Sequence, residues 1–261
     1  MTPLWRVELA DGIAVATYDH PPVNYMTTRG FDELAVLVEG WFAPEVRAVV
    51  LTGRPGGAFV THFSVEEIVA RLDGAARHPA RPPSAVFQRI NDLPKPVVAA
   101  INGDCMGGGL ELALACDLRV AQRGDFRIGL PEVRLGIIPG AGGTQRLSRL
   151  LGVGAALDLL LRARVLTPDE AHAAGLVQEI ADDALAGATA IARQIAALPP
   201  AAVAAAKAAV HGGAALTLDA GIRVEADAAR RAKLSPDAAV ALRSYLALPV
   251  EGRRAWLDAD R

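Results

Sequence analysis

Short, almost entirely apolar runs recur along the first 180 residues and alternate with stretches whose apolar positions repeat every three or four residues. The short runs have the length and composition of β-strands, and two of them are apolar enough to be buried on both faces of a sheet. Asp11-Gly12, between the first two runs, is typical of a hairpin turn. The expected strands are residues 4–10, 13–18, 46–52, 97–101 and 117–121. Strands that alternate with helices indicate β-α-β construction.

Two helices in this part of the chain have recognisable start signals. Thr27 or Thr28 is a suitable N-cap for a helix that ends before Pro44. Ser64 begins a second helix, and Glu67, three residues further on, is its expected capping-box partner.

The pattern changes near residue 152, where alanine-rich segments with helical spacing begin to predominate. The expected helices are residues 155–162, 167–173, 182–198, 200–210 and 216–233. Pro199-Pro200 is the best candidate for a domain boundary, because successive prolines interrupt regular structure. The sequence therefore predicts a core over residues 1–198 and a helical region over 199–261 that packs against another subunit.

The composition narrows the class of protein. Of 261 residues, 52% are hydrophobic and 21% are charged, which is typical of a folded globular chain. The net charge of −2 and the absence of a basic stripe argue against a nucleic-acid partner. No window reaches the roughly 18 apolar residues of a membrane span, and no signal peptide is visible. Two cysteines form no disulfide framework, so a cytoplasmic protein is expected.

A first candidate for chemistry is the segment NGDCMGGGLELA at residues 102–113. It follows a buried strand, and its consecutive glycines Gly107, Gly108 and Gly109 open a helix. Glycines let a ligand approach the backbone, and the unpaired N–H groups of a helix start favour negative charge. Glu111 lies one turn into this helix. The alternative is a tight strand-to-helix junction in which Glu111 only balances the helix dipole.

A second candidate is the segment GLPEVRLGIIPGAGGTQRL at residues 129–147. Pro131 can begin a short helix with Glu132 in its first turn, and Gly140 belongs to a loop suited to close backbone approach. Apolar neighbours would partly desolvate the Glu132 carboxyl. Desolvation raises the pKa of a carboxyl and suits it to general acid or base catalysis near neutrality. The alternative is a solvent-facing glutamate on a surface helix.

These two segments, in this order, closely resemble the enoyl-CoA hydratase/isomerase superfamily, also called the crotonase family. The resemblance extends over residues 15–180 and includes Pro22-Val23-Asn24 and the run VRAVVLTG at 46–53. It implies an α/β fold of the ClpP/crotonase type, a spiral of β-β-α units followed by a helical C-terminal region that forms trimers, often paired into hexamers.

The resemblance also implies roles for particular residues. Glu111 and Glu132 match the two glutamates that flank the substrate double bond, where one activates water and the other delivers a proton to the α-carbon. Backbone amides of Gly108 and Phe63 match the oxyanion hole. Two carboxyls favour hydration of a 2-enoyl-CoA, whereas one suffices to move a double bond. The alternatives are an isomerase, a thioester hydrolase, a decarboxylase, or a non-catalytic acyl-CoA-binding protein, against which the intact glutamates argue.

The segment around residue 62 departs from the family, which usually has Gly-Ala where this chain has His62-Phe63. A binding or packing role is favoured for His62, with a catalytic role as the alternative. Coenzyme A is expected as part of the substrate, with no further cofactor and no metal. The expected substrate-binding residues are Pro22, Val23, Asn24, Tyr25, Thr61, His62, Ser64, Gly107, Pro131 and Gly140.

Overall fold

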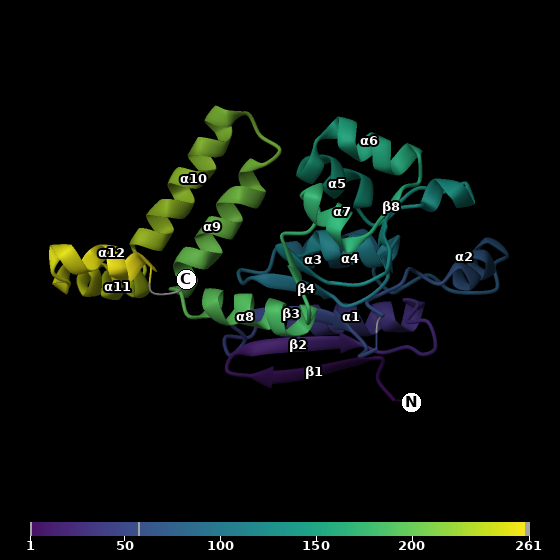
Figure 1. The fold of residues 1–261 in the computed structure, drawn as a ribbon, viewed down its shortest axis with the longest axis horizontal. Coiled ribbons are helices and arrows are strands. Elements are labelled where there is room, and N and C mark those ends of the chain that lie inside the picture. The colour runs from purple at the N-terminus through teal and green to yellow at the C-terminus, as the bar shows by residue number, and fades with distance from the viewer. Residues whose placement is uncertain (1, 57, 259–261) are drawn as a thin grey trace.

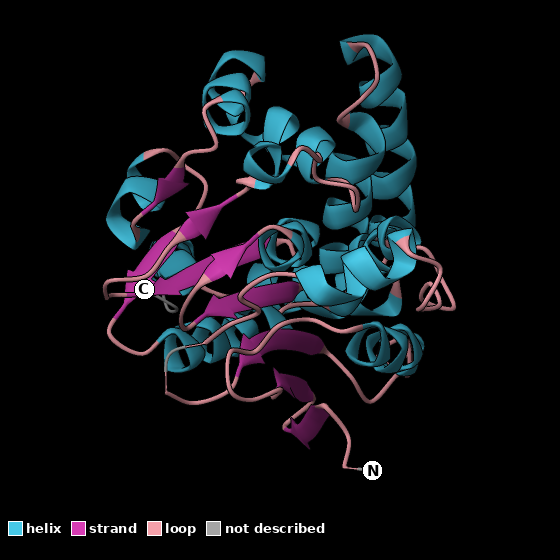
Figure 2. Cartoon of the chain, turned by 90° about the vertical axis from the view of Figure 1, so that its right-hand side faces the viewer, coloured by secondary structure: helices cyan, strands magenta, loops and turns pink. Residues whose placement is uncertain are grey.

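The computed structural model describes residues 2–56 and 58–258, which are built around a six-stranded sheet with the order β1-β2-β3-β4-β6-β9. β1 and β2 pair antiparallel across Asp11-Gly12, and the remaining neighbours pair parallel (Figure 2). The strands are β1 Trp5–Ala10, β2 Ile13–Tyr18, β3 Ala48–Gly53, β4 Val97–Ile101, β6 Leu118–Gln122 and β9 Glu179–Ala181.

A smaller sheet runs beside the first and consists of β5 Cys105–Met106, β7 Ile128–Gly129 and β8 Val165–Leu166. Isolated bridges join Met26 to Phe63 and Ala58 to Asp104. Successive turns of the chain therefore add a long strand to the large sheet, a short extended piece beside it, and then a helix. This is the spiral of β-β-α units that the family resemblance implies.

The helices of the core connect these strands along the chain (Figure 1). They are α1 Thr28–Gly40, α2 Val65–Leu72, α3 Pro83–Asn91, α4 Gly108–Ala115, η1 Glu132–Leu135, α5 Gly143–Leu151, α6 Val153–Leu161 and α7 Pro168–Ala173. α3, α5, β7 and β8 were not predicted from the sequence. Thr27 and Ser64 cap α1 and α2 as expected, because each side chain accepts a backbone N–H three residues on.

Of the two hydrogen bonds in the expected capping box of α2, the one from the backbone N–H of Ser64 to the Glu67 carboxylate is wrong. The carboxylate of Glu67 does not return to the backbone of Ser64 but accepts hydrogen bonds from the N–H and hydroxyl of Thr28 at the start of α1. The backbone N–H of Ser64 is bonded instead to the carbonyl of Met26. Glu67 thus ties α2 to α1 rather than stabilising its own helix start.

Both faces of the central strands β3 and β4 are buried, as their apolar runs predict. Alternate residues of β3 and β4 point into two different cores, so Val49 and Leu51 join the main core while Val50 packs on the other face. That second face is covered by α8 Ala184–Ala196, whose alanines 184, 188 and 192 lie against it. Small side chains let the helix approach the sheet closely.

Beyond α8 the chain leaves the sheet. α9 Pro200–Gly213 and α10 Leu218–Lys233 pack on each other, and α11 Pro236–Ala247, η2 Val250–Gly252 and α12 Arg253–Asp258 follow (Figure 1). The expected boundary at 198/199 lies between α8 and α9 and remains a prediction. Within the described residues no single helix is long and apolar enough to cross a membrane, and only α8 and α9 together, bent by 110°, pass that test of length and composition.

Candidate active site

Glu111 is a buried carboxyl in the first turn of α4, with only 5% of its surface exposed. Its Oε1 accepts hydrogen bonds from the backbone N–H groups of Ala141 at 2.7 Å and Gly143 at 2.8 Å. Burial raises the pKa of this carboxyl, and the two hydrogen bonds together with the positive charge of Arg146 oppose the rise. Glu111 is therefore fixed in orientation by groups that favour its charged form.

The three glycines before Glu111 are needed for different reasons. Gly107 has a positive φ of 49°, which side-chain-bearing residues rarely adopt. A Cβ on Gly109 would lie 1.8 Å from the carbonyl oxygen of Val60, so no other residue fits there. A Cβ on Gly108 would lie 3.3 Å from the Cβ of Phe63. The run therefore lets α4 begin directly against the segment 60–63.

The same approach brings two backbone amides together. The backbone nitrogen of Phe63 lies 3.6 Å from the position of a Cβ on Gly108. The carbonyl of His62 accepts a hydrogen bond from the N–H of Met26, and the N–H of Ser64 donates to the carbonyl of Met26. The N–H of Phe63, between these two groups, therefore points away from Met26. Over residues 2–56 and 58–258, neither the Phe63 nor the Gly108 N–H has a protein acceptor. These two donors thus remain for a ligand oxygen.

Glu132 approaches the glycine turn from the other side. It lies in η1, for which Pro131 is the N-cap residue, and its Oε1 lies 3.2 Å from the position of a Cβ on Gly107. Its Oε2 is buried and has no hydrogen-bond partner among the described residues. Burial, with a smaller contribution from the charge of Glu111, raises the pKa of Glu132 to about 7. Glu132 therefore changes protonation state near neutral pH.

The shielding of Glu132 differs in one detail from the sequence-based expectation. Leu130 is buried, whereas Leu135 is 61% exposed. The glycine turn also shields the carboxyl, because a Cβ on Gly107 would lie 3.2 Å from Oε1 of Glu132.

One cavity of about 550 Å³ joins these groups. Eight of the predicted site residues line it: His62, Phe63, Gly107, Gly108, Glu111, Pro131, Glu132 and Gly140. The rest of its wall is largely apolar and was missed by sequence reasoning. Phe31 of α1 and Phe87 of α3, whose rings pack edge to face at 5.6 Å, form part of that wall. The cavity thus places two carboxyls and two free amides beside an apolar chamber.

Six predicted binding residues do not line this cavity: Pro22, Val23, Asn24, Tyr25, Thr61 and Ser64. The side chain of Asn24 is fully buried and its amide donates to the carbonyls of Tyr18, Ala58 and Phe59. Asn24 therefore holds the loop after β2 against the loop after β3 and offers no group to a ligand. Thr61 similarly donates its hydroxyl to the carbonyl of Val23, and Ser64 caps α2.

The side chains of Tyr25 and His62 form a stacked pair next to the cavity, with ring centroids 4.2 Å apart. Nδ1 of His62 lies 2.8 Å from the carbonyl oxygen of Phe63. His62 has no positive φ, so a residue other than glycine is unstrained at this position. The ring of Phe63 turns toward Arg71, whose guanidinium carbon lies 4.9 Å from the ring centroid.

No group of three or more potential metal ligands occurs among the residues that the structure describes.

Comparison with known proteins identifies the family of the chain. A model of the family described as "Enoyl-CoA hydratase/isomerase" matches residues 8–246. The short-chain-enoyl-CoA hydratase of Clostridium acetobutylicum is 37% identical over 222 residues, which cover 83% of this chain and 84% of that protein. The fatty acid oxidation complex subunit alpha of Shewanella putrefaciens is 40% identical over 175 residues, but the match spans only 25% of its length.

Solved structures give the same result. An enoyl-CoA hydratase from Bacillus anthracis superposes with a TM-score of 0.85 at 32% identity, over 93% of this chain and 95% of that one. An enoyl-CoA hydratase from Geobacillus kaustophilus superposes with a TM-score of 0.85 at 29% identity, over 94% of each chain. With its spiral core and its pair of glutamates, the chain belongs to the enoyl-CoA hydratase/isomerase family.

Proposed function

We propose that this chain is an enoyl-CoA hydratase that adds water reversibly across the double bond of a 2-enoyl-CoA thioester. The observation that carries the proposal is the convergence of Glu111 and Glu132 on one cavity beside the free amides of Phe63 and Gly108. Hydration needs a base for water, an acid for the α-carbon and a site for negative charge, and this cavity holds groups suited to all three.

The different surroundings of the two carboxyls assign their roles. Glu111 accepts two backbone hydrogen bonds and faces a guanidinium, so it serves as the carboxylate that takes a proton from water. The pKa of Glu132 is raised to about 7 by burial, so this group carries a proton to the α-carbon. Two carboxyls whose environments favour different protonation states are the usual basis of such a division.

Electrons move toward the thioester carbonyl in this reaction. The water oxygen forms a bond to the β-carbon, and the displaced π-electrons give an enolate whose oxygen carries negative charge. The amides of Phe63 and Gly108 are placed to donate to that oxygen as an oxyanion hole. The enolate then takes the proton of Glu132 at the α-carbon, while Glu111 holds the proton removed from water, so atoms and charge balance.

Substrate enters this scheme as an acyl-CoA thioester, with no additional cofactor. The apolar wall that contains Phe31 and Phe87 suits the acyl chain, because apolar surface is buried there. The stacked rings of Tyr25 and His62 lie beside the cavity on the loops that the family resemblance assigns to coenzyme A.

A comparison of two double-bond positions tests the proposal. With short 2-enoyl-CoA, we expect the absorbance of the conjugated thioester to fall as water adds, and mass spectrometry to show a gain of one water. With the corresponding 3-enoyl-CoA, we expect slow or no conversion. Fast conversion of the 3-enoyl ester without uptake of water would instead identify an isomerase, and release of free coenzyme A a thioester hydrolase.

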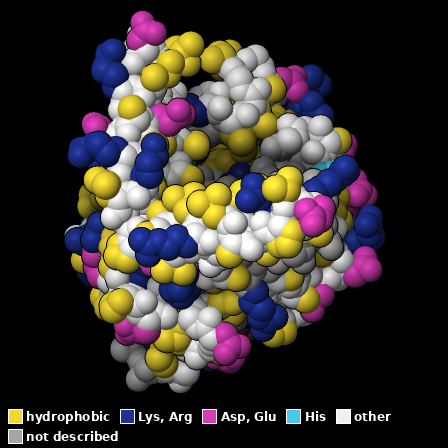
Figure 3. Space-filling view, turned by 90° about the vertical axis from the view of Figure 1, so that its left-hand side faces the viewer, with side chains coloured by type: hydrophobic (Ala, Val, Ile, Leu, Met, Phe, Trp, Pro, Cys, Tyr) yellow, Lys and Arg dark blue, Asp and Glu magenta, His cyan; other side chains and the backbone are white. Residues whose placement is uncertain are grey.

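We also infer that the chain assembles into a trimer or a hexamer. Large apolar side chains are exposed on the helices after the core, and Figure 3, which views that side, shows hydrophobic side chains in a band across it. Exposed apolar area of this kind marks interfaces. The residues include Val210, Leu218, Ile222 and Leu234.

Light scattering of the purified protein is expected to give the mass of three or six chains. Leu218→Asp combined with Ile222→Asp should lower that mass, because charged side chains are costly in an apolar interface. Leu72→Asp, at an equally exposed leucine on α2, is the matched control and should leave the mass unchanged. An active monomer would contradict the inference.

A further inference from the structure

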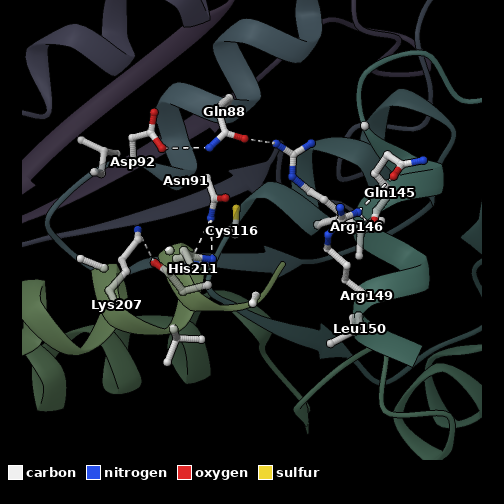
Figure 4. Close-up of a pocket in the computed structure, with 18 of the residues that line it drawn as sticks. Gln88, Asn91, Asp92, Cys116, Gln145, Arg146, Arg149, Leu150, Lys207 and His211 are labelled. Atoms are coloured by element: carbon white, nitrogen blue, oxygen red, sulfur yellow. Dashed lines mark hydrogen bonds and ion pairs between the residues drawn. The ribbon is translucent and has the colours of Figure 1, made fainter. Parts of the chain in front are cut away.

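A second cavity lies behind Glu111, between α3, α4, α5 and α9 (Figure 4). Its lining combines polar and charged side chains with apolar ones, and its volume is about 900 Å³. Arg146 of α5 lines this second cavity, whereas Ala141, the residue that binds Glu111, lines the first. The side chain of Arg146 thus connects the wall of one cavity to the catalytic site in the other.

A continuous set of hydrogen bonds makes this connection. Nη2 of Arg146 donates to Oε1 of Gln88 on α3 at 3.3 Å, and Nη1 donates to the carbonyl of Ala141 at 3.0 Å. The N–H of Ala141 donates in turn to Oε1 of Glu111. Gln88 is itself held by Asp92, because its Nε2 donates to Oδ1 at 2.9 Å. Figure 4 shows Gln88 between Asp92 and Arg146.

The loop beneath Arg146 is shaped to receive it. Gly142 has a φ of 104°, and a Cβ on this residue would lie 2.1 Å from Nη1 of Arg146. The missing side chain therefore leaves the space in which the guanidinium lies over the loop. Residues 141 and 143, on either side of Gly142, are the two donors to Glu111. The guanidinium of Arg146 therefore lies over residues 141–143, the segment that orients the Glu111 carboxyl.

We propose that Arg146 is a positioning residue for the reaction, which acts on Glu111 through the backbone of Ala141 and through its own positive charge. The inference rests on the proposed hydratase function, since it assigns Glu111 the part of the base. Arg146 does not line the cavity of the glutamates, so it is not itself a catalytic residue.

The charges around Glu111 and Arg146 determine how removal of the Arg146 charge should change the pKa of Glu111. Glu111 faces Arg146 on one side and Glu132 across the cavity. Arg146 faces groups from three elements besides the carboxyl: Cys116 after α4, Asp92 after α3 and Arg149 on α5. Lys207 and His211 of α9, which line the same cavity, are paired with Asp117. Arg146 is therefore the cation that opposes the rise in the pKa of Glu111 caused by burial.

The test compares the pH dependence of kcat/KM in wild type, Arg146→Gln and Arg146→Lys. Arg146→Gln removes the charge, so the pKa of Glu111 should rise and the acidic limb of the profile should move to higher pH. Loss of the clamp should also lower kcat about 10–100-fold. Arg146→Lys keeps the charge and should hold the acidic limb near that of wild type while kcat falls in part.

Arg149→Gln is the matched control. Arg149 is on the same helix and lines the same cavity, but among the described residues its guanidinium is hydrogen-bonded only to Gln145. It should leave both the acidic limb and kcat unchanged. If Arg146→Gln fails to fold, Gln88→Leu removes only the outer support of the guanidinium and should lower kcat without changing KM.

Two outcomes overturn the inference. One is an Arg146→Gln profile whose acidic limb coincides with that of wild type, which would leave Arg146 a purely structural role. The other comes from a direct measurement, in which the Glu111 carboxyl is titrated by carbon-13 NMR and assigned with Glu111→Gln. An equal pKa in wild type and Arg146→Gln would exclude the inference even if the chain hydrated no enoyl-CoA, so its failure is distinguishable from failure of the proposed function.

Discussion

Glu111→Gln and Glu132→Gln are each expected to lower kcat for hydration about 10²–10⁴-fold while the enoyl-CoA still binds. The amide keeps the shape of the carboxyl, but it cannot take up or deliver the proton. The combined loss in the double variant should be smaller than the product of the single losses, because both groups act on the same addition of water. Initial rates and binding calorimetry with a short 2-enoyl-CoA measure the two quantities separately.

Glu66→Gln provides the control for this pair. Glu66 lies on α2, close to Phe63 in the chain but outside the lining of the cavity. Its replacement should leave kcat unchanged. A variant set in which Glu132→Gln is inactive and Glu111→Gln nearly normal would indicate double-bond isomerisation instead. Turnover that is indifferent to both changes would remove the catalytic role of the glutamates.

Gly108→Val is expected to reduce kcat about 10²–10³-fold, the usual effect of losing one donor from an oxyanion hole. A Cβ at this position would already lie 3.3 Å from the Cβ of Phe63, so a branched side chain forces the two amides apart. KM should change less than kcat, because charge on the substrate oxygen develops only in the transition state.

Gly40→Val is the matched control for that prediction. Gly40 is the last residue of α1 and lies outside the lining of the cavity, and a Cβ there would meet no atom within 4 Å. The same substitution at this glycine should therefore have little effect on kcat. Circular dichroism of both variants distinguishes a local effect at Gly108 from loss of the fold. Equal turnover in the two variants would exclude the Gly108 amide from the site.

Much of this architecture was predictable because it is local. The central strands β3 and β4 are short apolar runs buried on both faces, and the caps Thr27 and Ser64 act within their own helices. The second half of the expected capping box failed because the partner of Glu67 is Thr28, 39 residues earlier. A carboxylate near a helix start has several amides within reach, and only the tertiary packing of α1 against α2 decides among them.

The apolar wall of the cavity was missed although a signal for it was present. Pro83 begins α3, and Val86, Phe87 and Ile90 follow with helical spacing. The prolines and arginines of residues 77–83, whose composition is typical of surface loops, obscure that pattern. In contrast, the loop at 139–143 was correctly expected to allow close backbone approach, but its amides turn to Glu111 rather than to a ligand. Sequence spacing identifies such a loop without indicating what approaches it.

The two glutamates are embedded to different depths. Glu111 belongs to a helix of the main core and is fixed by a second loop, whereas Glu132 lies on a single 3₁₀ turn followed by the exposed side chains of Leu135, Ile137 and Ile138. A substitution at Glu111 therefore disturbs packing that the whole fold shares, but residues 132–138 are free to diverge with little loss of stability. New reactions on coenzyme A thioesters can therefore arise by substitutions in residues 132–138 while the carboxyl of Glu111 stays in place.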